Sequence, residues 1–338
     1  MSSPAAQQPT PQLFFRTINA YQQTEALKAA IELETFTAIG EGNATAPEIA
    51  KRCGTSERGM RILCDFLCII GFLAKDRNRY SLTPDSAMFL DKHSPAYLGG
   101  VTEFIASPMI TEPFKNFAEA VRKGGTTMPD GGTVSHDNPI WVKFARAMAP
   151  MMALPARLMT NLVDPAADRK LKILDIAAGH GLYGIEFAKN NPQAIVVALD
   201  WPNVLEVAKE NAVSAGVAER YSTIEGSAFD VDYDSGYDLI LLTNFLHHFD
   251  PPTNETLLRK VHAALADGGR AVTLEFIPND DRISPPEASF SVQMLGGTEG
   301  GDAYTFPELE RMFANAGFAG SEVHPLPPSI QQVVISQK

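Results

Sequence analysis

Apolar positions in the first third of the chain follow helical spacing and then alternate. Between residues 24 and 39 they recur every three or four residues, which predicts one helix that ends at the GEGN stretch. In TAPEIAKRC, Thr45 and Glu48 form a capping box at the start of a second helix, and Gly54 ends it. A third helix is predicted over residues 56–70, followed by two short strands around the polar turn of FLAKDRNRYSLT. Three helices and a hairpin are the outline of a winged helix.

A winged helix suggests DNA binding, but two features of the sequence argue against it. The third helix carries apolar residues around most of its circumference, which is typical of a buried helix and not of one that lies in a groove. The chain holds 28 Lys and Arg against 40 Asp and Glu, a formal net charge of -12, which disfavours nucleic acid or an anionic membrane as partner. We therefore expect a packing or dimerisation module.

From residue 170 onward, short apolar runs alternate with amphipathic helices. The runs are KILDIA, AIVVALD, STIEG, DLILLTNF, RAVTLEF, SEVHPL and QQVVISQK, and the helices are LYGIEFAKNN, VLEVAKENAVSAG, NETLLRKVHAALADGG and TFPELERMFANAGF. This alternation predicts an α/β fold with a Rossmann-like, mostly parallel sheet, whose ligand crevice lies beyond the carboxyl ends of the strands. A glycine-rich connection over residues 122–139 and a helix dense in Met and aromatic side chains, IWVKFARAMAPMMALPARLM, precede the sheet. Such helices usually belong to the core, and they also form adaptable walls for apolar ligands.

Length and cysteine use narrow the class of protein. At 338 residues the chain is longer than most single domains, which favours two domains or one with a large extension. Its three cysteines lack a paired framework, as in reducing compartments. The first residues lack the features of a signal peptide, and no apolar run reaches the roughly 20 residues of a membrane helix. We expect a cytoplasmic protein without a membrane partner, and a flexible tail over residues 1–12.

The run LDIAAGHGLYG contains a glycine turn. Gly179, Gly181 and Gly184 match the spacing of a dinucleotide-binding turn, and Asp200 ends the next apolar run about 20 residues on. Asp175 stands four residues before Gly179, at the end of the first strand, where we expect its carboxylate to face the ligand. That carboxylate would repel a pyrophosphate, whereas it would attract the amino group and sulfonium of S-adenosylmethionine (SAM). SAM is therefore the predicted ligand, with NAD as the alternative.

These motifs resemble class I SAM-dependent O-methyltransferases with an N-terminal winged-helix dimerisation domain, which include plant caffeate-type and bacterial antibiotic and pigment enzymes. The resemblance covers about residues 13–338, through the N-terminal helices, LDIAAGHG, LDWPNV, GSAFD, LLTNFLHHFD, ALADGGRAVTLEF and YTFPELERMFANAGF. It implies a seven-stranded SAM-methyltransferase sheet with an antiparallel last pair, and a homodimer formed through the N-terminal domain. The implied parts are residues 13–105 for dimerisation, 106–165 as helices that roof a substrate pocket, and 166–338 for SAM binding and catalysis.

The resemblance implies SAM contacts at the carboxyl ends of the first four strands. They are Asp175, Ala177, Gly179 and Gly181 at the turn, Asp200 and Trp201 after the second strand, Ser227, Ala228 and Phe229 in GSAFD, and Asn244 after the fourth strand. Two positions depart from the family, because Ser227 replaces an acid that commonly binds the adenine amino group and Ala177 replaces a glycine. The substrate pocket is expected to contain Phe144, Met148, Met294 and Tyr304.

The turn in LLTNFLHHFD carries the catalytic candidates. Methyl transfer from a sulfonium needs an aimed nucleophile, and a hydroxyl nucleophile also benefits from a base such as histidine. His247 aligns with the base histidine of the family, and His248 stands where the family has an acid. Glu275 corresponds to one acid that orients the base, whereas Ala303 replaces the second. The two histidines and Glu275 could also ligate a metal, but no helical His pair or Cys pair reinforces this, and no metal is expected.

The sequence thus predicts SAM-dependent transfer of a methyl group to a hydroxyl of a small aromatic or apolar metabolite, with S-adenosylhomocysteine (SAH) as the product. His247 is the predicted base. The departures at Ala303 and His248 leave C- or N-methylation, or another reaction of a SAM-binding enzyme on this fold, open as alternatives. From other classes of protein, a winged-helix regulator and an NAD-linked oxidoreductase remain as alternatives.

Overall fold

The computed structural model describes residues 8–134, 138–164 and 169–338. Its internal contacts divide the chain into two compact units, Met1–Thr102 and Glu103–Lys338. The first seven residues of the expected tail lie outside the described residues, and the chain becomes helical at Gln12. The part limits at residues 105 and 165 stay predictions.

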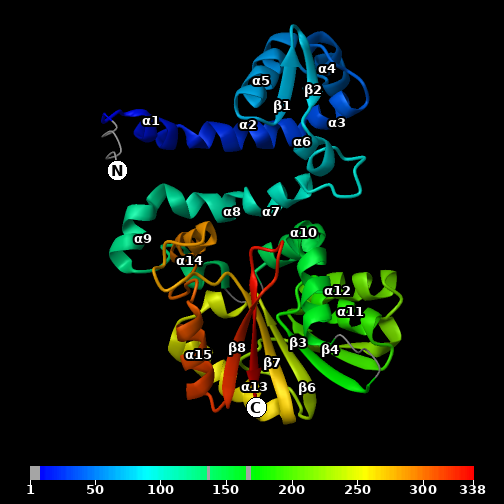
Figure 1. The fold of residues 1–338 in the computed structure, drawn as a ribbon, viewed down its shortest axis with the longest axis vertical. Helices are drawn as coiled ribbons and strands as arrows, with labels where there is room; N and C mark the ends of the chain where they lie inside the picture. The colour runs from blue at the N-terminus through cyan, green and yellow to red at the C-terminus, as the bar shows by residue number, and fades with distance from the viewer. Residues whose placement is uncertain (1–7, 135–137, 165–168) are drawn as a thin grey trace, which may run out of the picture. The chain divides into compact units, whose positions relative to one another are not determined.

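The N-terminal unit is mostly helical. It contains α1 (Gln12–Ile18), α2 (Ala20–Glu32), α3 (Thr35–Gly40), α4 (Ala46–Cys53), α5 (Glu57–Ile69), the antiparallel hairpin of β1 (Leu73–Asp76) and β2 (Arg79–Leu82), and α6 (Pro84–Phe89) (Figure 1). The predicted capping box is confirmed, since the Glu48 carboxylate accepts a hydrogen bond from the Thr45 backbone N–H at 2.9 Å. Gly54 ends α4 in the left-handed conformation, at φ 64°, as expected. The hairpin and the third predicted helix are also confirmed.

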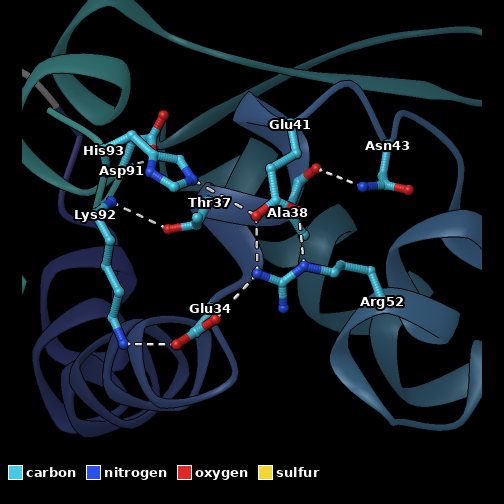
Figure 2. A network of polar contacts seen from close by, with 9 residues as sticks. All are labelled: Glu34, Thr37, Ala38, Glu41, Asn43, Arg52, Asp91, Lys92 and His93. Carbon is cyan, nitrogen blue, oxygen red and sulfur yellow. Dashed lines mark hydrogen bonds and ion pairs between the residues drawn. The ribbon is translucent and has the colours of Figure 1, made fainter.

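The single helix predicted over residues 24–39 is wrong, because the chain breaks between α2 and α3. Glu34 adopts the left-handed conformation there, at φ 58°. Figure 2 shows its carboxylate between two cations, with Lys92 Nζ at 2.7 Å and an Arg52 guanidinium nitrogen at 3.1 Å. Arg52 also binds Glu41 just beyond the end of α3, at 2.6 Å. Contacts from residues distant in sequence therefore hold both ends of α3, and helical spacing alone cannot reveal them.

The predicted burial of the third helix is also wrong for the single chain. Met60, Cys64 and Leu67 of α5 are buried in the core of the unit. Ile62 and Ile69 point away from this core and are 43% and 79% exposed. One stripe of α5 packs within the unit, and its opposite side presents apolar side chains to the surface.

The C-terminal unit contains the predicted seven-stranded sheet. Its strands are β3 (Leu171–Ile176), β4 (Ala194–Asp200), β5 (Tyr221–Glu225), β6 (Tyr237–Thr243), β7 (Leu265–Glu275), β8 (Gly320–Pro325) and β9 (Gln332–Gln337), in the order β5-β4-β3-β6-β7-β9-β8. The first five are parallel, and β9 runs antiparallel to both of its neighbours. The strand order reverses between β3 and β6, where ligands bind in such sheets.

Helices cover both faces of this sheet. On one side lie α11 (Leu182–Asn190) and α12 (Pro202–Ser214), and on the other α13 (Pro251–Ala264) and α15 (Phe306–Asn315) (Figure 1). All four were predicted from the alternation of apolar runs. The central strands are apolar on both faces because both are covered, as in most parallel sheets.

Further helices precede or interrupt this alternation. They are α7 (Thr102–Ile105), α8 (Pro108–Thr111), α9 (Phe117–Lys123), the Met-rich α10 (Ile140–Val163) and α14 (Phe290–Gly297). Short 3-10 turns occur at Gly99–Val101, Glu112–Asn116, Pro129–Val134, Ala218–Arg220, Leu246–His248 and Pro286–Ser289. The predicted connection over residues 122–139 includes residues 135–137, which lie outside the described residues. The sequence pattern had not indicated α14.

Candidate active site

A cavity of about 800 Å³ opens at the carboxyl ends of the parallel strands. Its floor comes from the turns after β3, β4, β5 and β6. Its walls come from the helices α7, α8, α10 and α14, from the 3-10 turns at Glu112–Asn116 and Pro129–Val134, and from the residue after β7. The walls are rich in aromatic and methionine side chains, namely Phe104, Phe114, Trp141, Phe144, Met148, Met151, Met152, Phe276, Phe290 and Met294. A large apolar cavity with a few polar groups at one end is typical of a small-molecule site.

Most of the predicted site residues lie around this one cavity. Those that line it are Phe144, Met148, Ala177, Gly179, Asp200, Trp201, Ser227, Ala228, Phe229, Asn244, His247, His248 and Met294. The cavity lining does not include Asp175, Gly181, Glu275 or Tyr304. The structure therefore gathers predicted residues from four strand ends and two helices, and it places four predicted residues behind the cavity wall.

The glycine turn has the backbone conformation that its sequence suggests. Gly179 and Gly181 have φ values of 58° and 73°, in the left-handed region. A side chain at Gly181 would place its Cβ only 2.5 Å from the Tyr221 hydroxyl, so this glycine allows close packing. Ala177, which stands where the family has glycine, also has a positive φ, 54°. An alanine in this conformation costs about 1–2 kcal/mol relative to its usual backbone angles.

Asp200 fastens the turn to the end of β4. Its Oδ2 accepts a hydrogen bond from the Gly179 N–H at 2.8 Å, and its Oδ1 accepts one from the Trp201 N–H at 2.7 Å. Burial raises the pKa of Asp200 to about 6, which the two backbone donors partly oppose. The carboxylate lines the cavity and has lone pairs left for the hydroxyls of a ribose.

Asp175 does not face the cavity, and the expectation that its carboxylate points at the ligand is wrong. The side chain is fully buried, and its Oδ2 accepts a hydrogen bond from the Gly184 N–H at 3.1 Å, in the first turn of α11. Burial raises its pKa to about 7. Within a strand covered on both faces, this side chain points toward α11 instead of past the sheet edge, so it supports the turn from behind.

His247 and Glu275 form a buried pair at the cavity wall. His247 lies in the 3-10 turn after β6, and Glu275 is the last residue of the neighbouring strand β7. The His247 Nδ1 and Glu275 Oε2 atoms are 2.5 Å apart, and the two residues are 5% and 3% exposed. Glu275 Oε1 also accepts hydrogen bonds from the backbone N–H groups of Phe245 and Leu246, at 3.1 and 2.9 Å. A carboxylate can only accept, so His247 donates from Nδ1 and its Nε2 keeps a lone pair.

The matches with known proteins agree with this geometry. Residues 114–319 match the O-methyltransferase domain, and residues 15–92 match the O-methyltransferase dimerisation domain. The 3-hydroxy-5-methyl-1-naphthoate 3-O-methyltransferase of Streptomyces sahachiroi is 32% identical over 301 residues, which are 87% of this chain and 86% of that protein. This chain belongs to the O-methyltransferase family.

Solved structures give the same result for this O-methyltransferase. A candidate O-methyltransferase from Nostoc punctiforme PCC 73102 is 55% identical, with a TM-score of 0.95 over 98% of this chain and 100% of that one. PigF, solved with SAH, is 25% identical, with a TM-score of 0.85 over 98% of this chain and 100% of that one. The predicted family, the sheet and the SAM-dependent class of enzyme are thereby confirmed.

One predicted pocket residue of the O-methyltransferase is misplaced. Tyr304 lies in the core beside α13 and α15, and its hydroxyl donates to the Phe249 carbonyl oxygen. The expectation that it supplies a hydroxyl to the substrate pocket is therefore wrong. Its neighbour Ala303, which replaces the second orienting acid of the family, is 1% exposed, and Asp302 on the other side pairs with Arg282 at 3.0 Å. Glu275 is thus the carboxylate bound to the His247 ring.

Two residues of the glycine turn were missed as pocket residues. His180 and Tyr183 both line the cavity, although both stand inside the quoted motif. The His180 ring stacks on Phe144, with centroids 6.2 Å apart, and its Nδ1 accepts a hydrogen bond from the Leu182 N–H at 3.2 Å. Burial lowers the pKa of His180 to about 4, so the ring is neutral. Only their positions beside Gly179, Gly181 and Gly184 could have indicated them, because the backbone conformation there decides which side chains point inward.

Neither a helix that could span a membrane nor a cluster of metal ligands occurs in the described residues. Over residues 8–134, 138–164 and 169–338, no helix is both long and apolar enough to cross a membrane. In the same ranges, no three side chains of His, Cys, Asp or Glu come together as metal ligands.

Proposed function

We propose that this O-methyltransferase transfers the methyl group of SAM to a hydroxyl on a small, flat aromatic acceptor, with His247 as the general base. The observation that carries the proposal is the 2.5 Å contact between His247 Nδ1 and Glu275 Oε2 at the wall of an aromatic cavity. A carboxylate held by backbone donors fixes both the orientation and the tautomer of the imidazole. A base of this kind typically contributes a factor of roughly 10² to 10⁴ in rate.

The acceptor, SAM and His247 together account for every bond and proton of the reaction. The acceptor oxygen forms a bond to the methyl carbon, the carbon–sulfur bond breaks with its electron pair left on sulfur, and the hydroxyl proton moves to Nε2 of His247. The imidazolium that results lies next to the buried Glu275 carboxylate, which stabilises it.

The residues at the strand ends fit SAM. When bound, SAM supplies a methyl group activated by its sulfonium. We assign the ribose hydroxyls to the Asp200 carboxylate at the end of β4 and the adenine to the strand-end residues Trp201 and Ser227. A Cβ at Gly179 would lie 3.6 Å from the Phe144 ring, on the cavity side, so glycine leaves the backbone of the turn open to a ligand.

The acceptor class follows from the walls of the cavity. Trp141, Phe144 and Phe290 offer aromatic faces and edges, and Met148 and Met294 are adaptable apolar contacts. A flat ring with a hydroxyl directed at His247 fits such walls. The substrate in the name of the Streptomyces sahachiroi relative, a hydroxynaphthoate, is of this general shape.

Substitution of the base tests the proposal. With 1-naphthol as acceptor, we expect His247→Ala to keep the affinity for SAH within about twofold and to lose at least about 100-fold in kcat. His93→Ala is the matched control, because the His93 side chain is 70% exposed and lies in the other unit. Calorimetry measures SAH binding and mass spectrometry measures methylated product. Turnover of His247→Ala equal to that of the wild type would reject the base.

We also infer that the N-terminal unit forms the homodimer. Its first helices carry large apolar side chains at the surface, at Leu13, Phe14, Phe15, Ile18 and Tyr21, each more than half exposed. Ile62 and Ile69 of α5 add to this apolar surface. Exposed patches of this kind mark protein interfaces, and residues 15–92 match a dimerisation domain.

A further inference from the structure

His248 stands beside the proposed base in the same cavity. The centroids of the His247 and His248 rings are 4.3 Å apart, with their planes inclined at 56°. The His248 ring also meets the Trp141 ring edge to face, at 5.3 Å. Both histidines line the cavity. The His248 ring therefore contacts both the base and an aromatic residue of the wall.

The surroundings of His248 fix its hydrogen-bonding state. Burial, together with the neighbouring His247, holds the pKa of His248 well below its usual value, so the ring is neutral. Its Nδ1 is enclosed and has no hydrogen-bond partner among the described residues. A proton on Nδ1 would make it a buried donor without a partner, which is rarer in proteins than a buried acceptor without one. The proton therefore belongs on Nε2, the ring nitrogen left for the cavity.

We propose that His248 donates a hydrogen bond to a second, uncharged oxygen of the acceptor. This oxygen is bonded to the ring carbon next to the one that carries the hydroxyl to be methylated. This inference rests on the proposed function, in which His247 takes the proton of that hydroxyl. Because the two rings are adjacent, the Nε2 lone pair of His247 and the Nε2–H donor of His248 face neighbouring positions of the same acceptor molecule. The acceptor class is then a phenol with an ortho hydroxyl, ether or carbonyl oxygen. At this position the family's acid would accept a hydrogen bond, whereas His248 donates one.

A pair of isomers tests the inference. The acceptors 2-methoxy-1-naphthol and 4-methoxy-1-naphthol carry the same substituent, ortho or para to the hydroxyl. We expect the wild type to prefer the ortho isomer by about tenfold in kcat/KM, the factor that one hydrogen bond supplies. His248→Phe keeps a flat ring without a donor, and its ratio should fall to about one. His248→Gln keeps an N–H donor and should recover most of the preference.

The ratio of two acceptors within one variant does not depend on how much of that variant is folded, and calorimetry with SAH confirms an intact cofactor site. A wild-type ratio near one, or a wild-type ratio retained in His248→Phe, overturns the inference. Failure of the proposed function looks different, because His247→Ala would then turn over both isomers at the wild-type rate whatever their ratio. If SAH binds but the wild type methylates neither isomer, both proposals are contradicted.

Discussion

Replacement of Glu275 by glutamine is the sharpest test of how the base is held. The Oε1 atom of Glu275 accepts backbone hydrogen bonds from Phe245 and Leu246, and lies 3.4 Å from a third N–H, that of His247. In Glu275→Gln the three backbone N–H groups need an acceptor, so the amide oxygen must take the place of Oε1. The amide NH₂ group is then directed at His247 Nδ1, where Oε2 stood. Two donors cannot face each other, so Nδ1 must become an acceptor and the proton must move to Nε2.

With its proton on Nε2, His247 has no lone pair left for the acceptor hydroxyl. We expect kcat to fall by most of the contribution of a general base, about 10² to 10⁴. This corresponds to about 2.7–5.4 kcal/mol of transition-state stabilisation, at 1.36 kcal/mol for each factor of ten. The fold should persist, because glutamine has nearly the same volume and retains the backbone hydrogen bonds.

The assay is kcat at saturating SAM and 1-naphthol, with SAH affinity measured in parallel. Glu206→Gln is the matched control, because the Glu206 side chain is 64% exposed and pairs with Lys209 on the surface of α12. We expect it to keep the wild-type kcat. A Glu275→Gln variant that binds SAH normally and keeps more than half of the wild-type kcat would refute the reasoning about the tautomer.

Three further outcomes follow from the structure. Burial raises the pKa of Asp175 to about 7, above the roughly 3.9 of an unfolded chain, so the unfolded state loses this proton first as pH rises. Asp175 should therefore lower the free energy of unfolding between about pH 4 and pH 7, by about 1.4 kcal/mol per unit of separation. Asp175→Asn should make this fall smaller in urea titrations and leave the contribution of Asp200, whose pKa burial raises to about 6; equal slopes for both proteins would contradict this. Ala177→Gly should raise the free energy of unfolding by about 1 kcal/mol, because glycine adopts a positive φ without strain. The control Ala212→Gly, inside α12, should lower the free energy of unfolding by a similar amount. A lower thermal midpoint for Ala177→Gly than for the wild type would contradict the strain at Ala177. Phe14→Glu should convert the dimer to a monomer in light scattering, whereas Ile195→Glu, also exposed but in the other unit, should leave it dimeric; a dimeric Phe14→Glu would place the interface elsewhere.

Local sequence signals determined the elements and their order. The alternation of apolar runs predicted all seven strands and the four helices on the faces of the sheet. The capping box at Thr45 and Glu48 also depends only on residues close in sequence. The ends of β6 and β7 could be read from the same pattern, and parallel neighbours end at the same edge. This pattern placed His247 and Glu275, 28 residues apart, at strand ends, whereas their partnership was implied by the resemblance to the family.

The tertiary structure alone decided where several side chains point. Asp175 and His180 belong to the same motif, yet Asp175 is buried behind the turn and His180 lines the cavity. Tyr304 was expected in the pocket and instead binds a backbone carbonyl in the core. The break at Glu34 depends on Arg52 and Lys92, which are distant in sequence. Periodicity reports which residues are buried, but the direction of a buried side chain depends on neighbours that only the folded chain brings together.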